Sequence, residues 1–341
     1  MKYDFPKLDL HLHLDGSMNP ELAWEMAKER GIEIPVETLE EFRDFMVVKE
    51  GTKDVNEYLA RFEYPLQIMQ DRDALVRTTK ELVTRLASQG LVYAEIRFAP
   101  QLHTRKGLTQ DEATDAVIEG AIQGMIEAKT INIGIICCAM SVGDLEVNRE
   151  ANLETVRVAK KYLDKGVVGV DLAGAECIVP IQEYHYIFDL AKELGVPFTC
   201  HAGDSDTADS VRKAMGFGAK RIGHGHKIFD DKELLKEAIK DEVAFEICPT
   251  SNIQCHTQPG FAEHPAKRML DLGARVTINT DNMTLADTTV DDEYDHCLDE
   301  MGFEYKDLIK MNINSARASF MDEDKKEKLV RELEKKLAMY M

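Results

Sequence analysis

Leucine alternates with polar residues near the start of the chain, over residues 8–14 (LDLHLHL). This alternation predicts a β-strand, because successive side chains of a strand point to opposite faces. Asp9, His11 and His13 then share one face, so the two imidazoles can reach a single cation. For a His-x-His pattern by itself, two unrelated histidines on a half-exposed strand remain the alternative. A metal site needs further ligands elsewhere in the chain.

The pattern changes to helical spacing over residues 19–89. Asn19-Pro20 predicts a helix start, since Asn is a good cap and Pro fits the first helical position. Apolar side chains recur further along at helical intervals, at Leu59, Phe62, Leu66 and Met69. This spacing is typical of core packing, and an apolar lid over an adjacent pocket is the alternative.

From residue 91 the chain alternates between predicted strands and helices. The strands are expected at 91–99, 131–140, 167–172, 196–201, 221–224, 243–248 and 275–279. The helices are expected at 109–129, 153–164, 182–194, 205–217, 232–240 and 266–272, and the remaining chain is mostly helical. Such alternation predicts a parallel sheet with right-handed crossovers.

With the first strand, this order predicts a (β/α)₈ barrel of the TIM type. Residues 19–89 would form a helical insertion after the first strand, and the C-terminus would be helical. An open, doubly wound sheet is the alternative, but no Gly-x-Gly-x-x-Gly follows a predicted strand. We therefore expect a single domain over residues 1–341.

Composition and charge narrow the class of protein. A net charge of -20 argues against a nucleic-acid partner, because phosphates would be repelled. The seven cysteines include no Cys-x-x-Cys, which argues against a disulfide framework and a thiolate zinc site. The N-terminus lacks the apolar core of a signal peptide, and no apolar stretch reaches the ~18 residues of a membrane span. We expect a cytoplasmic enzyme without membrane partners, in an oligomeric state that the sequence does not predict.

Titratable residues collect where the predicted strands end, which is the active-site face of such barrels. His11 and His13 end the first strand, Gly174 follows the fourth, and His201, His224 and Asp281 end the fifth, sixth and eighth. Three imidazoles and one carboxylate suit zinc with one position left for water. A divalent ion lowers the pKa of bound water to about 7, and a fourth histidine can orient that water or take its proton. We expect the histidines of predicted helices and loops to be surface or structural residues, namely His185, His256, His264 and His296.

The motifs around these positions match one family in order along nearly the whole chain. They are HLHLDGS at 11–17, VDLAG at 170–174, HAGD at 201–204, RIGHG at 221–225, CPTSN at 248–252 and NTDN at 279–282. On these motifs the chain resembles the adenosine deaminases, which are metal-dependent amidohydrolases with (β/α)₈ barrels. The resemblance implies hydrolytic deamination of adenosine and 2′-deoxyadenosine to inosine and ammonia, in purine salvage, with one Zn²⁺ per chain.

The resemblance also implies a role for each matching residue. The zinc ligands would be His11, His13, His201 and Asp281. His224 would position the attacking water and shuttle its proton, and Asp281 would also accept a hydrogen bond from that water. The substrate contacts would be Asp15 and Ser17 at the ribose, the N–H of Gly174 at purine N3, and Leu59 and Phe62 in the lid.

Two positions depart from the usual family pattern. Asp204 stands where Glu is usual, and this carboxyl would donate a proton to purine N1. Asp is shorter by roughly 1.5 Å of reach, and a misplacement of about 1 Å can cost on the order of 100-fold in rate. Asn282 stands where Asp is usual and would face purine N7, to which an amide donates at any pH.

These departures motivate an alternative substrate, namely another 6-substituted purine or an adenine derivative. A catalytically silent barrel that senses a nucleoside is a third hypothesis, and the intact set of metal ligands argues against it. Editing of polynucleotides is disfavoured, because the cysteine pair of the zinc deaminases that act on nucleic acid is missing.

Overall fold

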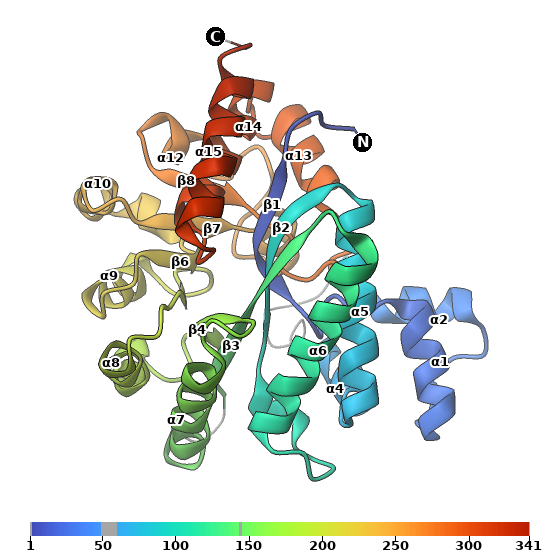
Figure 1. The fold of residues 1–341 in the computed structure, drawn as a ribbon. Helices are drawn as coiled ribbons and strands as arrows, with labels where there is room; N and C mark the ends of the chain where they lie inside the picture. Colours follow the sequence, from blue (N-terminus) through green and yellow to red (C-terminus); the bar gives the residue numbers. More distant parts are fainter. Residues whose placement is uncertain (1, 49–59, 143–144, 341) are drawn as a thin grey trace.

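The computed structural model describes residues 2–48, 60–142 and 145–340, and within these ranges it is a closed barrel of parallel strands surrounded by helices (Figure 1). The strands are β1 (Lys7–His13), β2 (Leu91–Phe98), β3 (Asn132–Ser141), β4 (Val167–Gly174), β5 (Cys200–Ala202), β6 (Arg221–His224), β7 (Ala244–Ile247) and β8 (Arg275–Ile278). Strands β1 to β4 pair in sequence order, and so do β5 to β8. The predicted fold class is confirmed.

Two seams close these halves into a barrel. At the β4–β5 seam, the N–H of Val170 donates to the carbonyl of Pro197 (2.9 Å), and the N–H of Thr199 donates to the carbonyl of Val170 (3.0 Å). The strand predicted at 196–201 is therefore shorter than expected, because only Cys200–Ala202 pairs with β6. Pro197 has no N–H of its own to contribute to a ladder.

The second seam joins β1 to the segment that follows β8. The N–H of Asp281 donates to the carbonyl of His11 (2.8 Å), and the N–H of His13 donates to the carbonyl of Asp281 (2.7 Å). This closure places residues from opposite ends of the sequence side by side at the carboxyl ends of the strands.

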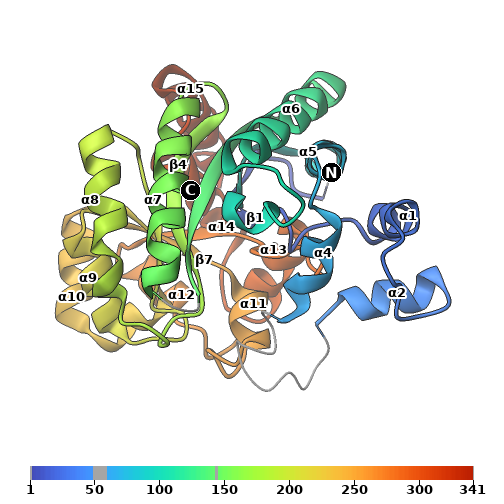
Figure 2. The ribbon, with the colours of Figure 1, turned by 90° about the horizontal axis from the view of Figure 1, so that it is seen from below.

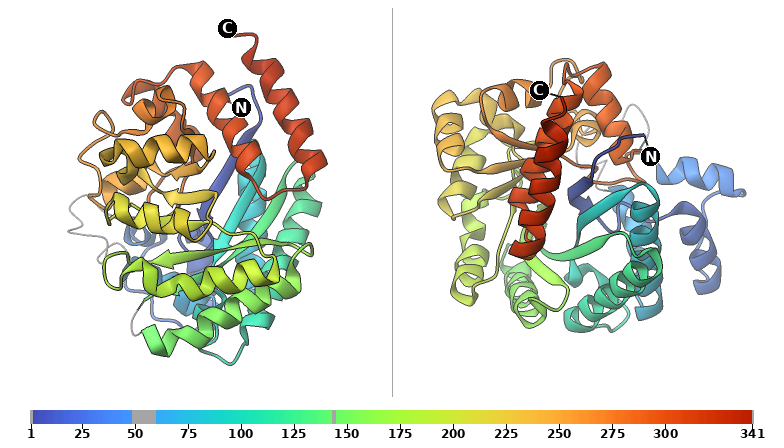
Figure 3. Two further views of the ribbon diagram at one scale, coloured as in Figure 1. Left: turned by 90° about the vertical axis from the view of Figure 1, so that its left-hand side faces the viewer. Right: turned by 45° about the horizontal axis from the view of Figure 1, so that its top comes forward.

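Helices cover the outside of the barrel (Figures 1 and 3). They are α5 (Arg72–Ser88), α6 (Gln110–Ala128), α7 (Leu145–Tyr162), α8 (His185–Leu194), α9 (Ala208–Gly216), α10 (Lys232–Lys240), α12 (Ala266–Asp271), α13 (Val290–Asp299), α14 (Tyr305–Ala318) and α15 (Glu323–Leu337). The C-terminal α14 packs on β1 and β8, and α15 packs on α14. The short helix α11 (Pro249–Gln254) was not predicted, and α7 begins before residue 153.

The insertion after β1 is helical where the structure describes it. It contains α1 (Pro20–Arg30), α2 (Leu39–Met46), the 3₁₀ turn η1 (Ala60–Phe62) and α4 (Glu63–Ile68). The side chain of Asn19 accepts the N–H of Leu22 (2.9 Å), so Asn19 caps α1 as predicted. Figure 2 shows α1 and α2 to one side of the barrel. None of the described helices is long and apolar enough to cross a membrane.

Candidate active site

The four predicted metal ligands converge at the carboxyl ends of the strands. One ligand atom from each of His11, His13, His201 and Asp281 lies within 4.8 Å of all the others. The Nε2 atoms of His11 and His13 lie 3.4 and 3.3 Å from Oδ1 of Asp281. Three imidazoles and a carboxylate at this spacing can hold a divalent ion.

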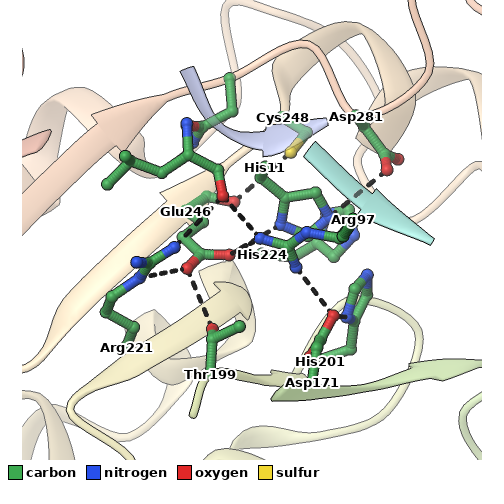
Figure 4. Close-up of polar contacts among 12 residues, drawn as sticks. His11, Arg97, Asp171, Thr199, His201, Arg221, His224, Glu246, Cys248 and Asp281 are labelled. Carbon is green, nitrogen blue, oxygen red and sulfur yellow. Dashed lines mark hydrogen bonds and ion pairs between the residues drawn. The ribbon is translucent and has the colours of Figure 1, made fainter. Parts of the chain in front are cut away.

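The opposite ring nitrogens of two of these histidines face buried carboxylates (Figure 4). Nδ1 of His11 lies 2.9 Å from Oε2 of Glu246, and Nδ1 of His201 lies 2.9 Å from Oδ2 of Asp171. Such pairing orients a metal-binding imidazole. Nε2 of His11 is buried and makes no hydrogen bond with the described residues. Because buried polar atoms normally have a partner, this nitrogen fits a bound cation.

Two buried arginines hold these carboxylates in place (Figure 4). Arg97 donates to Asp171 and to Glu246, both at 2.8 Å, and Arg221 donates to Glu246 at 2.7 Å. Burial would raise the pKa of Glu246, but Arg221 and Arg97 hold it well below its usual range. None of these four residues was among the predicted site residues. A charged residue in a buried strand, as in AFEI of β7, is the signal that could have found them.

The protonation states of His11, His13 and Asp281 favour metal binding, whereas the Asp171 carboxylate raises the pKa of His201 against the effect of its burial. Burial lowers the pKa values of His11 and His13, so their imidazoles are neutral near pH 7. Burial would raise the pKa of Asp281, but this pKa lies well below its usual range in the site, so the carboxyl is ionised near pH 7. The Oγ of Ser251 donates to Oδ2 of Asp281 (2.6 Å). Neutral imidazoles and an ionised carboxylate are the forms that coordinate a metal.

A second group overlaps with this one and contains His224 and Cys248 in place of His13 and His201. Burial raises the pKa of Cys248 well above its usual range, and its Sγ lies 3.4 Å from the Glu246 carbonyl. A protonated thiol is a poor metal ligand, since the thiolate is the form that coordinates. The group with His201 is therefore the better metal site.

His224 and Asp204 lie beside the metal-ligand cluster. The His224 ring centroid is 4.8 Å from that of His11. Oδ1 of Asp204 accepts hydrogen bonds from Nδ2 of Asn252 and Oγ1 of Thr257, both at 2.8 Å. It also lies 3.9 Å from Nδ1 of His224. The two residues predicted to handle protons are thus neighbours.

The loop that carries Asp204 is held by a carboxylate that was not among the predicted site residues. Glu176 accepts four backbone N–H groups, from Gly203 (2.8 Å), Asp204 (2.9 Å), Ser205 (2.8 Å) and Asp206 (3.0 Å). Burial and the Asp204 charge raise the pKa of Glu176, and the backbone hydrogen bonds oppose that rise. No local sequence pattern links Glu176 to Asp204, so only the folded chain reveals the contact.

A cavity of about 180 Å³ opens beside the metal-ligand cluster. Its lining includes His13 and three of the predicted substrate contacts, Asp15, Phe62 and Gly174. Leu66 also lines it, while Met69 is fully buried in the core. Of the apolar residues at helical spacing, Phe62 and Leu66 therefore line the cavity, whereas Met69 belongs to the core. The predicted lid residue Leu59 lies outside the described residues.

Ser17 and Asn282 are buried near this cavity but are absent from its described lining. The Oγ of Ser17 accepts the N–H of Met283 (3.1 Å), which ties the turn after β1 to the segment after β8. Asn282 packs on Gly16, where a Cβ would lie 1.9 Å from Oδ1 of Asn282. Their roles at the ribose and at purine N7 stay predictions.

One histidine expected at the surface or in a purely structural place lies next to the site. His264 is buried, and its Nε2 lies 3.2 Å from Oδ1 of Asn252, which also contacts Asp204 and His224. Its place in a predicted loop gave no sign of this contact. His185 and His256 are exposed, as expected.

Comparisons with known proteins show which family the chain belongs to. The family model described as adenosine deaminase matches residues 6–336. A curated adenosine deaminase from Haemophilus ducreyi is 40% identical over 94% of this chain and 93% of its own length. The chain belongs to the adenosine deaminase family. It is thus a hydrolytic deaminase, as the sequence predicted.

Solved structures share the fold of this adenosine deaminase family member. An adenine deaminase from Arthrobacter aurescens superimposes with a TM-score of 0.88 at 24% identity, over 98% of this chain and 100% of that chain. An amidohydrolase from Burkholderia ambifaria with bound Zn gives a TM-score of 0.86 at 22% identity, over 98% and 91% of the two chains. At these identities the likeness concerns the fold.

Proposed function

We propose that this adenosine deaminase family member converts adenosine and 2′-deoxyadenosine to inosine and ammonia, in purine salvage, with one Zn²⁺ per chain. The observation that carries the proposal is the convergence of three imidazoles and one carboxylate within 4.8 Å, beside Asp204 and His224. The nitrogen and oxygen donors suit zinc. The Burkholderia ambifaria amidohydrolase of the same fold was solved with bound Zn.

The ion would be held by His11, His13, His201 and Asp281. When bound, a divalent metal supplies a hydroxide nucleophile at neutral pH. Glu246 orients the imidazole of His11, and Asp171 orients that of His201, each through a contact of 2.9 Å.

The remaining residues act on the purine. Asp204 donates a proton to N1, which makes C6 electrophilic, and the N–H of Gly174 meets N3. The amide of Asn282 donates to N7, and Asp15 contacts the ribose from the cavity that it lines together with Phe62. His224 holds the attacking water. Burial raises the pKa of Asp15 to about 6, so it accepts hydrogen bonds from ribose hydroxyls at neutral pH.

The direct test is turnover of adenosine by the zinc-loaded protein. We expect loss of the adenosine absorbance and release of one ammonia for each inosine formed. A chelator-treated sample is the matched control and should be inactive until zinc is restored. Absence of turnover in a zinc-loaded, folded sample would overturn the proposal.

A second candidate keeps the chemistry and changes the substrate to adenine or an N6-substituted adenine derivative. The observation that favours it is Asp204, whose shorter side chain is also held at Oδ1 by Asn252 and Thr257. A panel of adenosine, 2′-deoxyadenosine, adenine and N6-methyladenosine, compared by kcat/KM, separates the two candidates. The cytoplasmic location and the lack of nucleic-acid or membrane partners stay predictions.

A further inference from the structure

A line of hydrogen bonds joins the start of α12 to His224 through two buried side chains. The backbone N–H of Ala266, the first residue of α12, donates to Nδ1 of His264 (3.2 Å). Nε2 of His264 lies 3.2 Å from Oδ1 of Asn252. Nδ2 of Asn252 lies 3.0 Å from Nδ1 of His224 and 2.8 Å from Oδ1 of Asp204.

The direction of every bond follows from the first one, because a backbone N–H only donates. Nδ1 of His264 must accept, so the proton of its neutral ring is on Nε2. Burial lowers the pKa of His264 to about 3, so the ring is neutral near pH 7. Nε2–H then donates to Oδ1 of Asn252, which fixes the orientation of the Asn252 amide.

The two N–H bonds of the Asn252 amide therefore point at Asp204 and at Nδ1 of His224. Nδ1 of His224 can only accept, so the neutral ring carries its proton on Nε2. Nε2 of His224 is therefore the nitrogen available to the metal-ligand cluster, where the His224 ring lies against the rings of His11 and His201. In this tautomer Nε2 has no lone pair with which to take a proton from water.

We propose that Asn252 and His264 are positioning residues that hold His224 in its Nε2–H tautomer and keep Asp204 in place. His224 then orients the attacking water as a hydrogen-bond donor. The water has Asp281 as its acceptor. The role at the water rests on the proposed function, whereas the tautomer is a property of the protein alone.

The tautomer can be measured directly on the zinc-loaded protein labelled with ¹⁵N-histidine. Two-bond ¹H–¹⁵N spectra distinguish a ring nitrogen that carries a proton from one that accepts, and a His224→Asn variant assigns the signals. We expect His224 to show an acceptor Nδ1 and a protonated Nε2. A protonated Nδ1 with a bare Nε2 overturns the proposal, whether or not adenosine is the substrate.

Two substitutions of His264 test how the tautomer is maintained. His264→Leu removes the donor to Asn252, whereas His264→Gln places an amide nitrogen near the position of Nε2. With Leu we expect mixed tautomers of His224 and a fall in kcat of roughly tenfold or more, with KM changed less than about twofold. With Gln we expect most of the kcat and the original tautomer to return. His185→Leu, at an exposed histidine, is the control and should change neither readout.

If His264 acted through packing alone, the result would differ, because its side-chain hydrogen bond would then have no effect on the His224 tautomer. If Leu and Gln reduce kcat equally, or if His264→Leu keeps both the tautomer and kcat, the proposal is wrong. If His264→Leu does not fold, Asn252→Asp decides, because a carboxylate accepts from Nδ1 and should move the His224 proton to Nδ1. An unchanged tautomer in folded Asn252→Asp overturns the proposal.

Discussion

Glu176 holds the backbone of Asp204, whose N–H donates to Oε2 of Glu176 at 2.9 Å. The same oxygen accepts the next two N–H groups along the loop, and Oε1 accepts that of Gly203. The Asp204 side chain is fixed separately, by Asn252 and Thr257. The position that the Asp204 carboxyl can reach therefore depends on how Glu176 holds its loop, as well as on the length of its own side chain.

Glu176→Gln should reduce kcat by on the order of 100-fold, because an amide N–H would face backbone N–H donors and displace Asp204 by about 1 Å. Zinc content, measured by mass spectrometry of the metal, should be unchanged. Glu183→Gln, on the exposed face of the turn η3 (Ile181–Tyr184), is the matched control. Full kcat in Glu176→Gln would show that the loop is held by other contacts.

Asp204→Asn should bind zinc normally and lose activity by roughly 10²- to 10⁴-fold, because an amide cannot supply the proton to purine N1. The amide still fits between Asn252 and Thr257, so the thermal midpoint should change little. Steady-state kinetics and metal analysis on the same sample separate the two effects. An Asp204→Asn variant with full activity contradicts the role of Asp204 as proton donor.

His11→Ala should lose both metal and activity. The substitution removes one ligand and leaves Glu246 without its contact to Nδ1 of His11. The control is His296→Ala, at a half-buried histidine of α13 that pairs with Glu300. This variant should keep both its metal and its activity. Metal analysis and adenosine turnover are the measurements, and zinc retained at full stoichiometry by His11→Ala would refute the assignment of this ligand.

Glu293→Gln should change how stability depends on pH. Glu293 is fully buried between Thr250 and Thr288, and burial raises its pKa to about 8. An unfolded Glu releases its proton near pH 4.3, whereas the folded one keeps it until about pH 8. The folded state binds more protons between these values, so this group's contribution to stability falls as pH rises through that window.

A glutamine has no such proton, so the thermal midpoint of Glu293→Gln relative to wild type should increase from pH 5 to pH 8. Differential scanning fluorimetry across this range measures the difference. Glu183→Gln should follow wild type at every pH. A difference that is constant with pH would mean that Glu293 does not keep its proton when buried.

Local patterns determined much of the fold. The alternation over residues 8–14 gave β1, and Asn19-Pro20 gave the start of α1, where the side chain of Asn19 accepts the N–H of Leu22. These signals are readable because period-two alternation and helix caps involve residues close in sequence. The strand at 196–201 was predicted too long, since its first residues meet only the β4 seam and do not pair with β6.

The sequence by itself determined the order of strands and helices, the candidate metal ligands at the strand ends, and the family. Tertiary structure alone decided what holds those residues in place. Glu246 meets His11 across 235 positions of sequence, and His264 reaches His224 through Asn252. Such contacts depend on barrel closure and on the direction of individual hydrogen bonds, for which no residue pattern along the chain carries a signal.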